Sequence, residues 1–277
     1  MTQRRSILVT GCSSGIGAWC ADALARDGWL VFSTARKPAD IAALQAKGLE
    51  ALYLDYREPE SIAECAAAVL DATGGTLDAL FNNGAYSQPG AVEDLPMAAL
   101  REQFEANFFG WHDLTRQIIP AMRAQGHGRI VNCSSILGLT PMRWRGAYVS
   151  SKFALEGLTL SMRMELEGSG IHVSLIEPGG IPSKIAINAL TYAEKYIDLE
   201  NSVHRDDYAI RIAQLRSGGT PEKPGNGPEL VWRVLKHALE SNNPKPHYVV
   251  VREAKLAAFA RRIVPSGLWY RILRKAS

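Results

Sequence analysis

The sequence predicts a doubly wound, parallel α/β sheet within a single domain. From residue 6 to residue 251, short apolar segments of strand length alternate with segments of helical periodicity. This alternation is typical of parallel sheets whose two faces are covered by helices. Polar or glycine-rich stretches follow several of the apolar strands, and such sheets bind ligands at the carboxyl ends of their strands. We therefore expect one ligand-binding edge.

The composition is that of an ordinary globular protein. The chain has 277 residues, 47% of them hydrophobic, and a net charge of +3, which is too small to indicate nucleic-acid binding. The four cysteines and six histidines show no ligand spacing, so we expect reduced thiols, no metal site and a cytoplasmic protein. No run of about 18 apolar residues and no signal peptide is present, so we expect no membrane-spanning segment.

The first strand, residues 6–10, leads into Gly11-Cys12-Ser13-Ser14-Gly15-Ile16-Gly17 and then into a helix that continues through Arg26. Glycines let backbone N–H groups approach a phosphate, and the N-terminus of the following helix favours negative charge. Any tight turn from strand to helix favours glycine. Three glycines at this spacing after the first strand nevertheless favour a nucleotide site.

The second strand, residues 30–34, ends in Ala35-Arg36-Lys37, about 20 residues after the glycine loop. In dinucleotide-binding folds an acidic residue near this point binds the ribose 2′-hydroxyl of NAD, whereas arginine accommodates the 2′-phosphate of NADP. Arg36 therefore favours NADP(H) over NAD(H). The alternative is that Arg36 is only a solvated side chain.

Five further strands and several helices complete the predicted sheet. We expect strands over 49–54, 77–81, 128–135, 172–177 and 248–251, and helices over 39–47, 61–72, 97–124 and 229–240. Asp55 ends one strand, the turn Asn82-Asn83-Gly84-Ala85 ends another, and Pro178-Gly179-Gly180-Ile181 ends a third. Asn107 lies inside the long helix, where asparagine is tolerated on the surface or kept to organise a polar site.

A helix over 147–167 carries the most reactive pair of side chains. Tyr148 and Lys152 are four residues apart and share one face of this helix. Tyrosine has a pKa of about 10, and a nearby ammonium group lowers it, so Tyr148 could exchange a proton with an alkoxide or alcohol. Ser135, at the end of the preceding strand, could hold a carbonyl oxygen. Such a pair also occurs by chance on surface helices, so the upstream motifs decide the interpretation.

Taken together, the motifs resemble the compact, single-domain branch of the short-chain dehydrogenases/reductases. They occur in one order: Thr10-Gly11-x-x-x-Gly15-x-Gly17, Asn82-Asn83-Gly84-Ala85, Asn107-x-x-Gly110, Ser135, Tyr148-x-x-x-Lys152 and Pro178-Gly179. The resemblance implies a Rossmann-type fold and an NADP(H)-dependent oxidoreductase acting on CH–OH groups. It implies that Tyr148 is the general acid/base and that Lys152 lowers its pKa and holds the nicotinamide ribose. Ser135, rather than Ser134, would bind the substrate oxygen, and Asn107 would hold a water in a proton relay.

The same resemblance implies the cofactor contacts. It implies that Asp55 touches the adenine, that Asn83 lies beside the adenosine, and that Ile181 and Ser183 bind the nicotinamide amide. The full implied set is Gly11, Ser13, Ser14, Gly15, Ile16, Gly17, Arg36, Asp55, Asn83, Gly84, Tyr148, Lys152, Pro178, Gly179, Ile181 and Ser183. Two departures stand out, because the family usually has Asn-Asn-Ala-Gly at 82–85 and lacks the extra Gly180. The 34–38 run resembles NADP-preferring members that act on steroids, retinoids or lipid-like ketones.

Residues 184–227 correspond to the family's mobile lid over the substrate. They contain a predicted helix over 186–199, a charged patch over 204–207 and a Gly/Pro-rich run over 217–228. Two sets of side chains are expected to line an apolar pocket, or else simply to pack the lid on the body: Ile185, Ile187, Leu190, Tyr192, Tyr196 and Ile197 from the lid, and Thr140, Met142, Trp144 and Arg145 from the opposite wall.

The tail, residues 252–277, is expected to be a helical extension of the domain. From 252 to 275 it has seven basic residues and one acid, with apolar residues and Trp269 between them. A basic amphipathic segment can lie on an anionic membrane surface. It can also cap the substrate pocket or a subunit contact, and this second interpretation is favoured. We expect a homodimer or homotetramer by analogy with the family. The competing hypothesis for the whole chain is a non-catalytic NADP(H)-binding sensor or scaffold, which would not need Ser135, Tyr148, Lys152 and Asn107 together.

Overall fold

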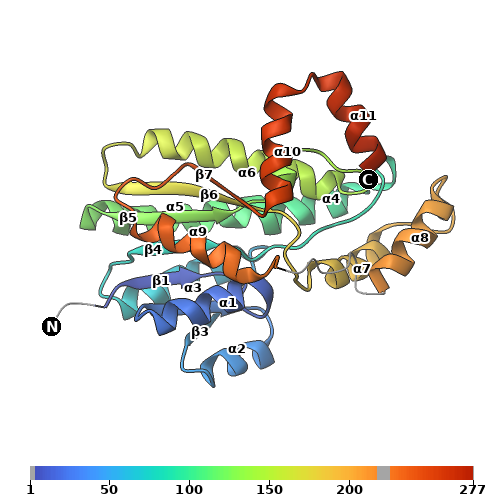
Figure 1. Ribbon diagram of the computed structural model, residues 1–277. Coiled ribbons are helices and arrows are strands. Elements are labelled where there is room, and N and C mark those ends of the chain that lie inside the picture. Colours follow the sequence, from blue (N-terminus) through green and yellow to red (C-terminus); the bar gives the residue numbers. More distant parts are fainter. Residues whose placement is uncertain (1–3, 217–224, 277) are drawn as a thin grey trace.

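The computed structural model describes residues 4–216 and 225–276 (Figure 1). They form a seven-stranded parallel sheet in the order β3-β2-β1-β4-β5-β6-β7. The strands are β1 (Ser6–Val9), β2 (Leu30–Ala35), β3 (Glu50–Tyr53), β4 (Ala79–Asn82), β5 (Gly128–Cys133), β6 (Ile171–Pro178) and β7 (His247–Val250). The order changes direction between β1 and β4, which is where doubly wound sheets open a ligand crevice. The predicted fold class is confirmed.

Helices cover both faces of the sheet. They are α1 (Gly15–Arg26), α2 (Pro38–Gln45), α3 (Pro59–Ala72), α5 (Gly110–Gln125), α6 (Gly146–Glu165) and α9 (Pro228–Glu240). Helix α1 packs against α9 on one face, and α3 packs against α5 on the other. Every residue of β1 and β4 is buried, as expected for parallel strands covered on both sides. This core fixes the carboxyl ends of the strands, from which the site is built.

The single helix predicted over 97–124 is interrupted at Asn107. Helix α4 (Met97–Phe104) continues through a π-helical turn (Glu105–Phe109) into α5. Two contacts explain the extra residue in this turn. The Asn107 side chain exchanges hydrogen bonds with the backbone of Tyr86 (2.9 and 3.2 Å), and a Cβ on Gly110 would lie 2.3 Å from Tyr56 O. The turn satisfies both contacts, and π-turns often occur at functional sites.

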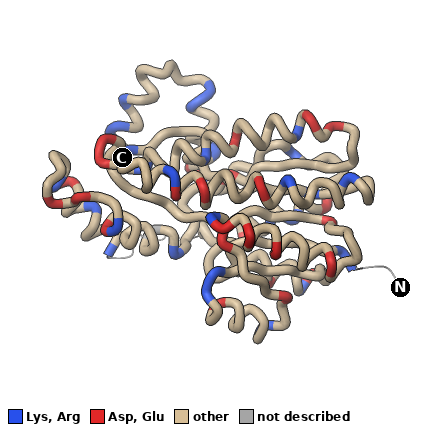
Figure 2. Tube along the Cα trace, turned by 180° about the vertical axis from the view of Figure 1, so that it is seen from behind, with Lys and Arg blue, Asp and Glu red and all other residues tan. Residues whose placement is uncertain are grey.

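The lid contains one helix more than the sequence predicts, and the tail is helical, as expected. The lid helix α7 (Ile185–Tyr196) ends three residues before the predicted end, and the charged patch begins an unpredicted helix, α8 (Arg205–Arg216). Residues 217–224 of the Gly/Pro-rich run lie outside the described residues. The tail forms a hairpin of α10 (Arg252–Ile263) and α11 (Ser266–Ala276), along which Lys and Arg are spaced (Figure 2). Within the described ranges, no helix is long and apolar enough to cross a bilayer.

Candidate active site

The glycine loop brings β1 and α1 into close contact with the turn after β4. Gly11 and Gly15 have φ angles of +69° and +60°, which favour glycine. A Cβ on Gly11 would lie 2.4 Å from Gly84 Cα, and a Cβ on Gly17 would lie 2.3 Å from Gly11 O. Ser14 precedes α1 in an extended conformation and gives no side-chain cap, so the first N–H groups of α1 remain available. This cradle fits the pyrophosphate of a dinucleotide.

The loop after β6 faces the glycine loop. A Cβ on Gly15 would lie 3.2 Å from Ser183 Cβ, so the two loops are neighbours at the carboxyl ends of the strands. Ile181 N–H donates to Gly179 O at 2.9 Å, and the expected contact of the Ile181 backbone with a nicotinamide amide remains a prediction. Gly179 is required by packing, because its Cβ would lie 2.5 Å from Val251 Cγ2, whereas a Cβ on Gly180 would meet nothing within 4 Å.

The turn Asn82–Ala85 supports the glycine loop. The Asn83 amide donates to Thr10 O at 3.0 Å, and Thr10 Oγ1 accepts the backbone N–H groups of Asn83 and Gly84 at 2.8 and 3.1 Å. Gly84 packs on Gly11, and a Cβ on Gly84 would lie 3.3 Å from Gly11 Cα. This close approach explains why glycine comes before alanine in the turn. Asn83 therefore fixes the turn against Thr10, and its expected place beside the adenosine remains a prediction.

Charged side chains meet where β2 and β3 end. Asp55 accepts from the backbone N–H, Nε and Nη2 of Arg57 at 3.1, 2.9 and 2.5 Å. Burial opposes ionisation of Asp55, but these bonds outweigh it and keep its pKa below the ordinary value. Arg36 Nη1 lies 3.7 Å from Asp55 Oδ2, and its side chain is 49% exposed. Arg57 was not singled out from the sequence. It binds the Asp55 carboxylate that is expected to touch adenine, while the Arg36 side chain is half exposed.

An ion-pair chain joins this corner to the lid. Arg57 Nη1 lies 2.6 Å from Glu102 Oε1, and Lys195 Nζ lies 2.9 Å from Glu102 Oε2. The Tyr196 hydroxyl also donates to Glu102. Lys195 and Tyr196 end the lid helix α7. The adenosine side of the groove and the lid therefore share one hydrogen-bonded network.

Tyr148 and Lys152 lie on one face of α6, as their spacing predicts. Lys152 Nζ is 5.8 Å from the Tyr148 ring centroid and donates to Cys133 O at 2.8 Å. It also lies 4.2 Å from the ring centroid of Trp111, a buried residue that the sequence analysis did not single out. Trp111 Nε1 donates to Gly84 O at 2.9 Å. Burial lowers the pKa of Lys152 to about 8. Trp111 thus holds the lysine against the end of β5.

Tyr148 lies beside Ser135 and Arg145. Burial, with a smaller effect from the Cys133 thiol, raises the pKa of Tyr148 to about 12, whereas Ser135 and the Arg145 guanidinium lower it. The lowering expected from Lys152 stays a prediction. Ser134 faces the other way, since a Cβ on Gly138 would lie 2.7 Å from Ser134 Oγ and 2.9 Å from Glu156 Cγ. The geometry supports Ser135 over Ser134 as the serine that meets a substrate oxygen.

Asn107 is fully buried beside the lysine turn. Its amide lies 3.4 Å from Ser151 Oγ, next to Lys152, and its remaining bonds go to Tyr86. Tyr86 in turn stacks on Tyr192 of the lid, with ring centroids 3.9 Å apart. Asn107 therefore fixes a strip of backbone between the catalytic helix and the lid. Its expected role in holding a water remains a prediction.

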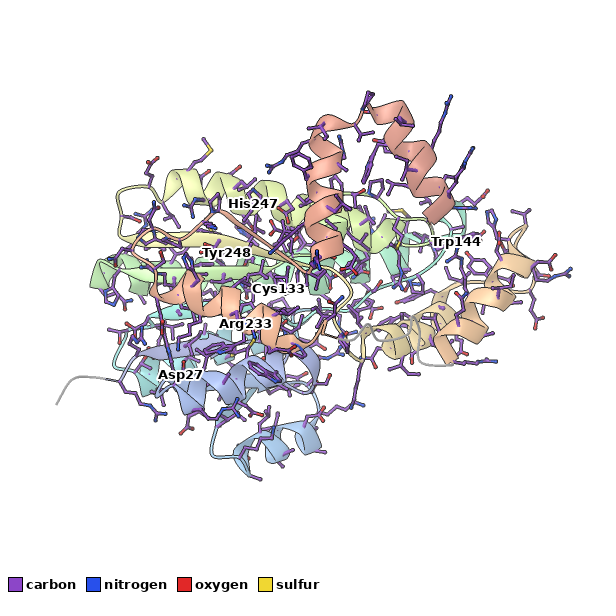
Figure 3. All side chains as sticks on the ribbon, in the orientation of Figure 1. Asp27, Cys133, Trp144, Arg233, His247 and Tyr248 are labelled. Atoms are coloured by element: carbon purple, nitrogen blue, oxygen red, sulfur yellow. The ribbon has the colours of Figure 1, made fainter. Side chains whose placement is uncertain are left out.

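Some of the residues expected to line the pocket pack the lid on the body instead, and others remain exposed. Trp144, Ile197 and Tyr208 form a second small core that packs the lid on the body, as the alternative interpretation had it (Figure 3). Met142 and Ile187 are each 44% exposed. Trp269 of α11 is buried and donates to Thr140 Oγ1 at 3.2 Å, so the tail lies against the predicted wall. This contact supports the capping interpretation of the tail.

A buried carboxyl cluster lies one helical turn beyond Lys152. His247 Nδ1 is 2.5 Å from Glu177 Oε1 and 3.7 Å from Glu156 Oε2. Ligand atoms of these three residues lie within 4.8 Å of one another, and no second group of this kind occurs among residues 4–216 and 225–276. The 2.5 Å distance is that of a hydrogen bond rather than of two ligands around an ion. The cluster therefore holds a proton in the fold.

We predict that this cluster makes stability depend on pH. Burial, with a further effect of Glu177, raises the pKa of Glu156 to about 7, so the folded state binds this proton more tightly than the unfolded state. The resulting stability is present at low pH and is lost as pH rises from about 4.5 to 7, by as much as about 3 kcal/mol. Glu156→Gln should therefore lose less Tm than the wild type between pH 5 and pH 8.

The control is Glu165→Gln at the exposed end of the same helix, whose Tm should follow the wild-type pH profile. Equal pH slopes for Glu156→Gln and the wild type would show that Glu156 does not carry this proton.

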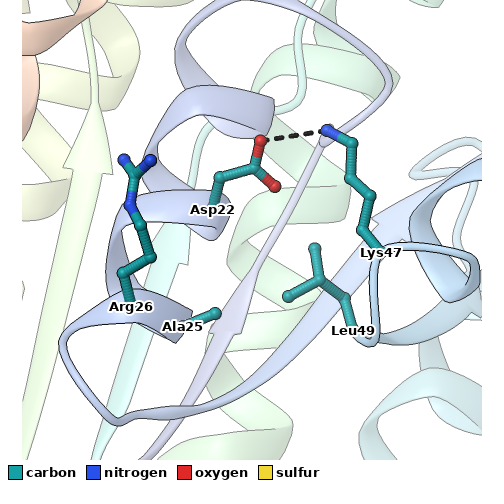
Figure 4. A pocket seen from close by; sticks show the side chains of 5 residues that line it. All are labelled: Asp22, Ala25, Arg26, Lys47 and Leu49. Carbon is teal, nitrogen blue, oxygen red and sulfur yellow. Dashed lines mark hydrogen bonds and ion pairs between the residues drawn. The ribbon is translucent and has the colours of Figure 1, made fainter.

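A depression on the opposite edge of the sheet is not part of this site. Asp22, Ala25, Arg26, Lys47 and Leu49 line it, and Lys47 Nζ lies 2.9 Å from Asp22 Oδ2 across it (Figure 4). Residues 22–26 belong to the C-terminal half of α1, remote from the glycine loop at its N-terminus. The depression therefore lies away from the carboxyl ends of the strands.

Comparisons with known proteins agree with this geometry. The short chain dehydrogenase family model matches residues 5–192. Uncharacterized oxidoreductase YbbO of Escherichia coli K12 is 36% identical over 277 residues, covering 98% of this chain and 94% of its own. Human retinol dehydrogenase 8 is 37% identical over 187 residues, covering 64% of this chain and 59% of its own.

Solved structures show the same architecture. A short-chain dehydrogenase from Streptomyces avermitilis has a TM-score of 0.77 at 28% identity, covering 99% of this chain and 100% of its own. A variant of actinorhodin polyketide ketoreductase, solved with NADPH, has a TM-score of 0.71 at 26% identity, covering 89% of this chain and 95% of its own. The chain thus belongs to the short-chain dehydrogenases, a family of oxidoreductases that act on CH–OH groups with a nicotinamide cofactor.

Proposed function

We propose that the chain is an NADP(H)-dependent carbonyl reductase, or the reverse alcohol dehydrogenase. The observation that carries the proposal is the buried group of Tyr148, Ser135 and Lys152 at the end of β5. When bound, the nicotinamide supplies or accepts the hydride. Ser135 and the Tyr148 hydroxyl hold the carbonyl oxygen, and Tyr148 gives that oxygen its proton. Lys152, seated on Trp111, binds the nicotinamide ribose and favours the phenolate that remains.

The preference for NADP(H) rests on Arg36. Its half-exposed guanidinium stands at the end of β2, where a 2′-phosphate would lie. The Asp55 carboxylate, the nearest acid at this corner, is already bound by Arg57. A bound carboxylate competes poorly for a ribose hydroxyl, and it leaves the corner positive. This charge balance supports a phosphorylated adenosine.

The proposed substrate has a large apolar body. The capping contact between Trp269 and Thr140 supports this, since it gives the site an aromatic wall. Two relatives have names of the same character: retinol dehydrogenase 8, and the 3-ketodihydrosphingosine reductase of Bacteroides thetaiotaomicron, which is 29% identical over 232 residues. The alternative is a non-catalytic NADP(H) sensor. It is disfavoured because a sensor does not require a buried Ser135, Tyr148 and Lys152 together.

The test compares NADPH and NADH oxidation with steroid, retinal-like, long-chain and small polar ketones. We expect turnover of an apolar class with NADPH. Arg36→Ala should raise KM for NADPH roughly tenfold to a hundredfold and leave KM for NADH nearly unchanged, because a charge-assisted hydrogen bond is lost. Lys37→Ala is the matched control and should change KM much less. Equal losses for both cofactors would refute the preference, and tight NADPH binding without turnover would favour the sensor.

Three further expectations accompany this proposal. The exposed side chains of Leu256, Phe259 and Ile263 on α10 support peripheral contact with an anionic membrane. Co-sedimentation with anionic vesicles, lost on deletion of 252–277, would test it.

Light scattering of the purified protein would test the expected homodimer or homotetramer. Fractionation of the producing cells would test the cytoplasmic location.

A further inference from the structure

Three arginines gather around Trp144 at the wall of the site. The Cζ atoms of Arg143 and Arg211 lie 5.4 and 4.7 Å from the Trp144 ring centroid. Arg145 follows directly in the chain and donates from Nη1 to Ser87 Oγ at 2.9 Å. Two of these arginines belong to the loop before α6, and Arg211 belongs to lid helix α8. The group therefore spans the boundary between body and lid.

The backbone at Trp144 is held in a costly conformation. Trp144 has a φ of +65°, in the left-handed region that non-glycine residues rarely adopt. Gly90 N–H donates to Trp144 O at 3.0 Å, and Gly90 forms an isolated parallel bridge with Arg145. Strained residues persist where the surrounding structure fixes them, and they cluster at ligand sites. The surrounding contacts hold Trp144 in this conformation between two arginines. The bridge to Gly90 and the hydrogen bond to Ser87 likewise hold Arg145 in place.

The positive charge of the group has little compensation. None of the ion pairs within 4 Å among the described residues includes Arg143, Arg145 or Arg211. Of the nearby acids, Asp207 acts on Arg211 from one turn earlier on α8, without an ion pair within 4 Å, and the other two are engaged elsewhere. Glu93 pairs with His204 at 2.6 Å, and Asp94 accepts from Ser202 and Tyr208 at 2.7 Å each.

Burial gives this charge a consequence. It lowers the pKa of Arg145 and of Arg211, and the pKa of Arg211 is lowered further by Arg143 and Arg145, with Asp207 opposing. Guanidinium groups stay charged at any ordinary pH. Arg145 and Arg211 are partly buried, whereas Arg143 is exposed. Partly buried cations without a carboxylate partner are costly unless an anion pairs with them. The group is thus an unbalanced positive charge that an anionic ligand can neutralise.

The reaction centre lies next to this group. Arg145 precedes the first residue of α6, and Tyr148 is three residues further on in its first turn. The Arg145 guanidinium is near enough to act on the pKa of Tyr148. Because Arg145 and Tyr148 both stand at the start of α6, an anion bound by Arg145 would lie near a carbonyl held by Tyr148 and Ser135. One molecule can supply both groups.

We propose that Arg145, with Arg143 and Arg211, binds a carboxylate carried by the carbonyl substrate itself. The substrate is then an oxo acid with an apolar body rather than a neutral ketone. This inference rests on the proposed reductase function and narrows its substrate class. The carboxylate pairs with the arginines, while Trp144 and the wall at Thr140 and Trp269 receive the apolar part. Arg211 already lies 4.7 Å from the Trp144 ring, so α8 needs no movement to contribute it.

The kinetic test compares 4-oxodecanoate with its methyl ester as substrates of the NADPH-loaded enzyme. The wild type should favour the free acid in kcat/KM by roughly tenfold to a hundredfold. Arg145→Gln keeps a donor for Ser87 Oγ and should abolish that preference by raising KM for the acid. Arg211→Gln on the lid surface should reduce the preference without risk to the fold. Arg205→Gln, on the same helix, is the matched control and should keep it.

A binding measurement separates this inference from the proposed function. Decanoate, which cannot be reduced, is titrated calorimetrically into the enzyme with NADPH bound. The wild type should bind decanoate at least tenfold more tightly than it binds methyl decanoate. It should also bind decanoate at least tenfold more tightly than Arg145→Gln does. Equal affinities would overturn the carboxylate site even if ketones are reduced. Tight decanoate binding without turnover of any ketone would refute the proposed reductase function but support the carboxylate site. A loss in kcat that is equal for acid and ester would show that Arg145 acts only on Tyr148.

Discussion

Tyr148→Phe is expected to lower kcat by a factor of about 10² to 10⁴, the usual contribution of a positioned general acid. The phenylalanine ring fills the same buried slot, so packing and the nearby Lys152 seat should be kept. Only the hydroxyl that gives the substrate oxygen its proton is lost. The variant should therefore oxidise NADPH far more slowly than the wild type, while its Kd for NADPH, measured by fluorescence titration, stays unchanged. Both measurements are made on the same preparation.

The control for this variant is Tyr53→Phe on strand β3, where the side chain is 41% exposed and donates to Glu58. Its kcat should equal that of the wild type. If Tyr148→Phe retained more than about a tenth of wild-type kcat, a group other than Tyr148 would have to supply the proton.

Gly17→Ala is expected to abolish cofactor binding. Its Cβ would lie 2.3 Å from Gly11 O in the glycine loop and 2.7 Å from Asn83 Nδ2 in the turn that supports this loop. Overpacking of this kind costs about 1–3 kcal/mol or more, and relief requires the loop to move. The N–H groups of α1 would then no longer converge on a phosphate. NADPH affinity should fall by at least roughly a hundredfold, and Tm should fall as well.

Gly267→Ala separates a general effect of alanine from a local one. A Cβ on Gly267, in the first turn of α11, would meet nothing within 4 Å. That variant should keep both Tm and NADPH affinity. Wild-type affinity in Gly17→Ala would mean that the glycine loop is not the phosphate cradle.

The sequence predicts the sheet well because its signals are local. Each strand is a short apolar run, and each site motif follows a strand, so the doubly wound topology places Arg36, Asp55, Ser135 and Ser183 at one edge. The four-residue spacing of Tyr148 and Lys152 likewise determines a shared helix face. These placements need no knowledge of which segments pack together.

Other parts of the site depend on tertiary contacts that the sequence does not encode locally. Trp111 could be read as one more core residue until Lys152 is found on its ring. Arg57 follows a strand like many solvated arginines, and only the fold brings it between Asp55 and Glu102. The π-turn at Asn107 arises because Asn107 must bond to the backbone of Tyr86 while Gly110 packs against Tyr56. Helix α8 was missed because its charged start resembles a loop.

The contact between Trp269 and Thr140 also bears on how such enzymes diverge. The family match ends at residue 192, so Trp269 comes from a stretch beyond it, while Thr140 lies within it. The family model thus covers the proposed catalytic residues and Thr140 but not the hairpin that contacts Thr140. We expect exchange of that hairpin between relatives to change the choice of substrate and to leave the hydride chemistry intact. We expect a tag fused to the C-terminus to affect the same contact between Trp269 and Thr140.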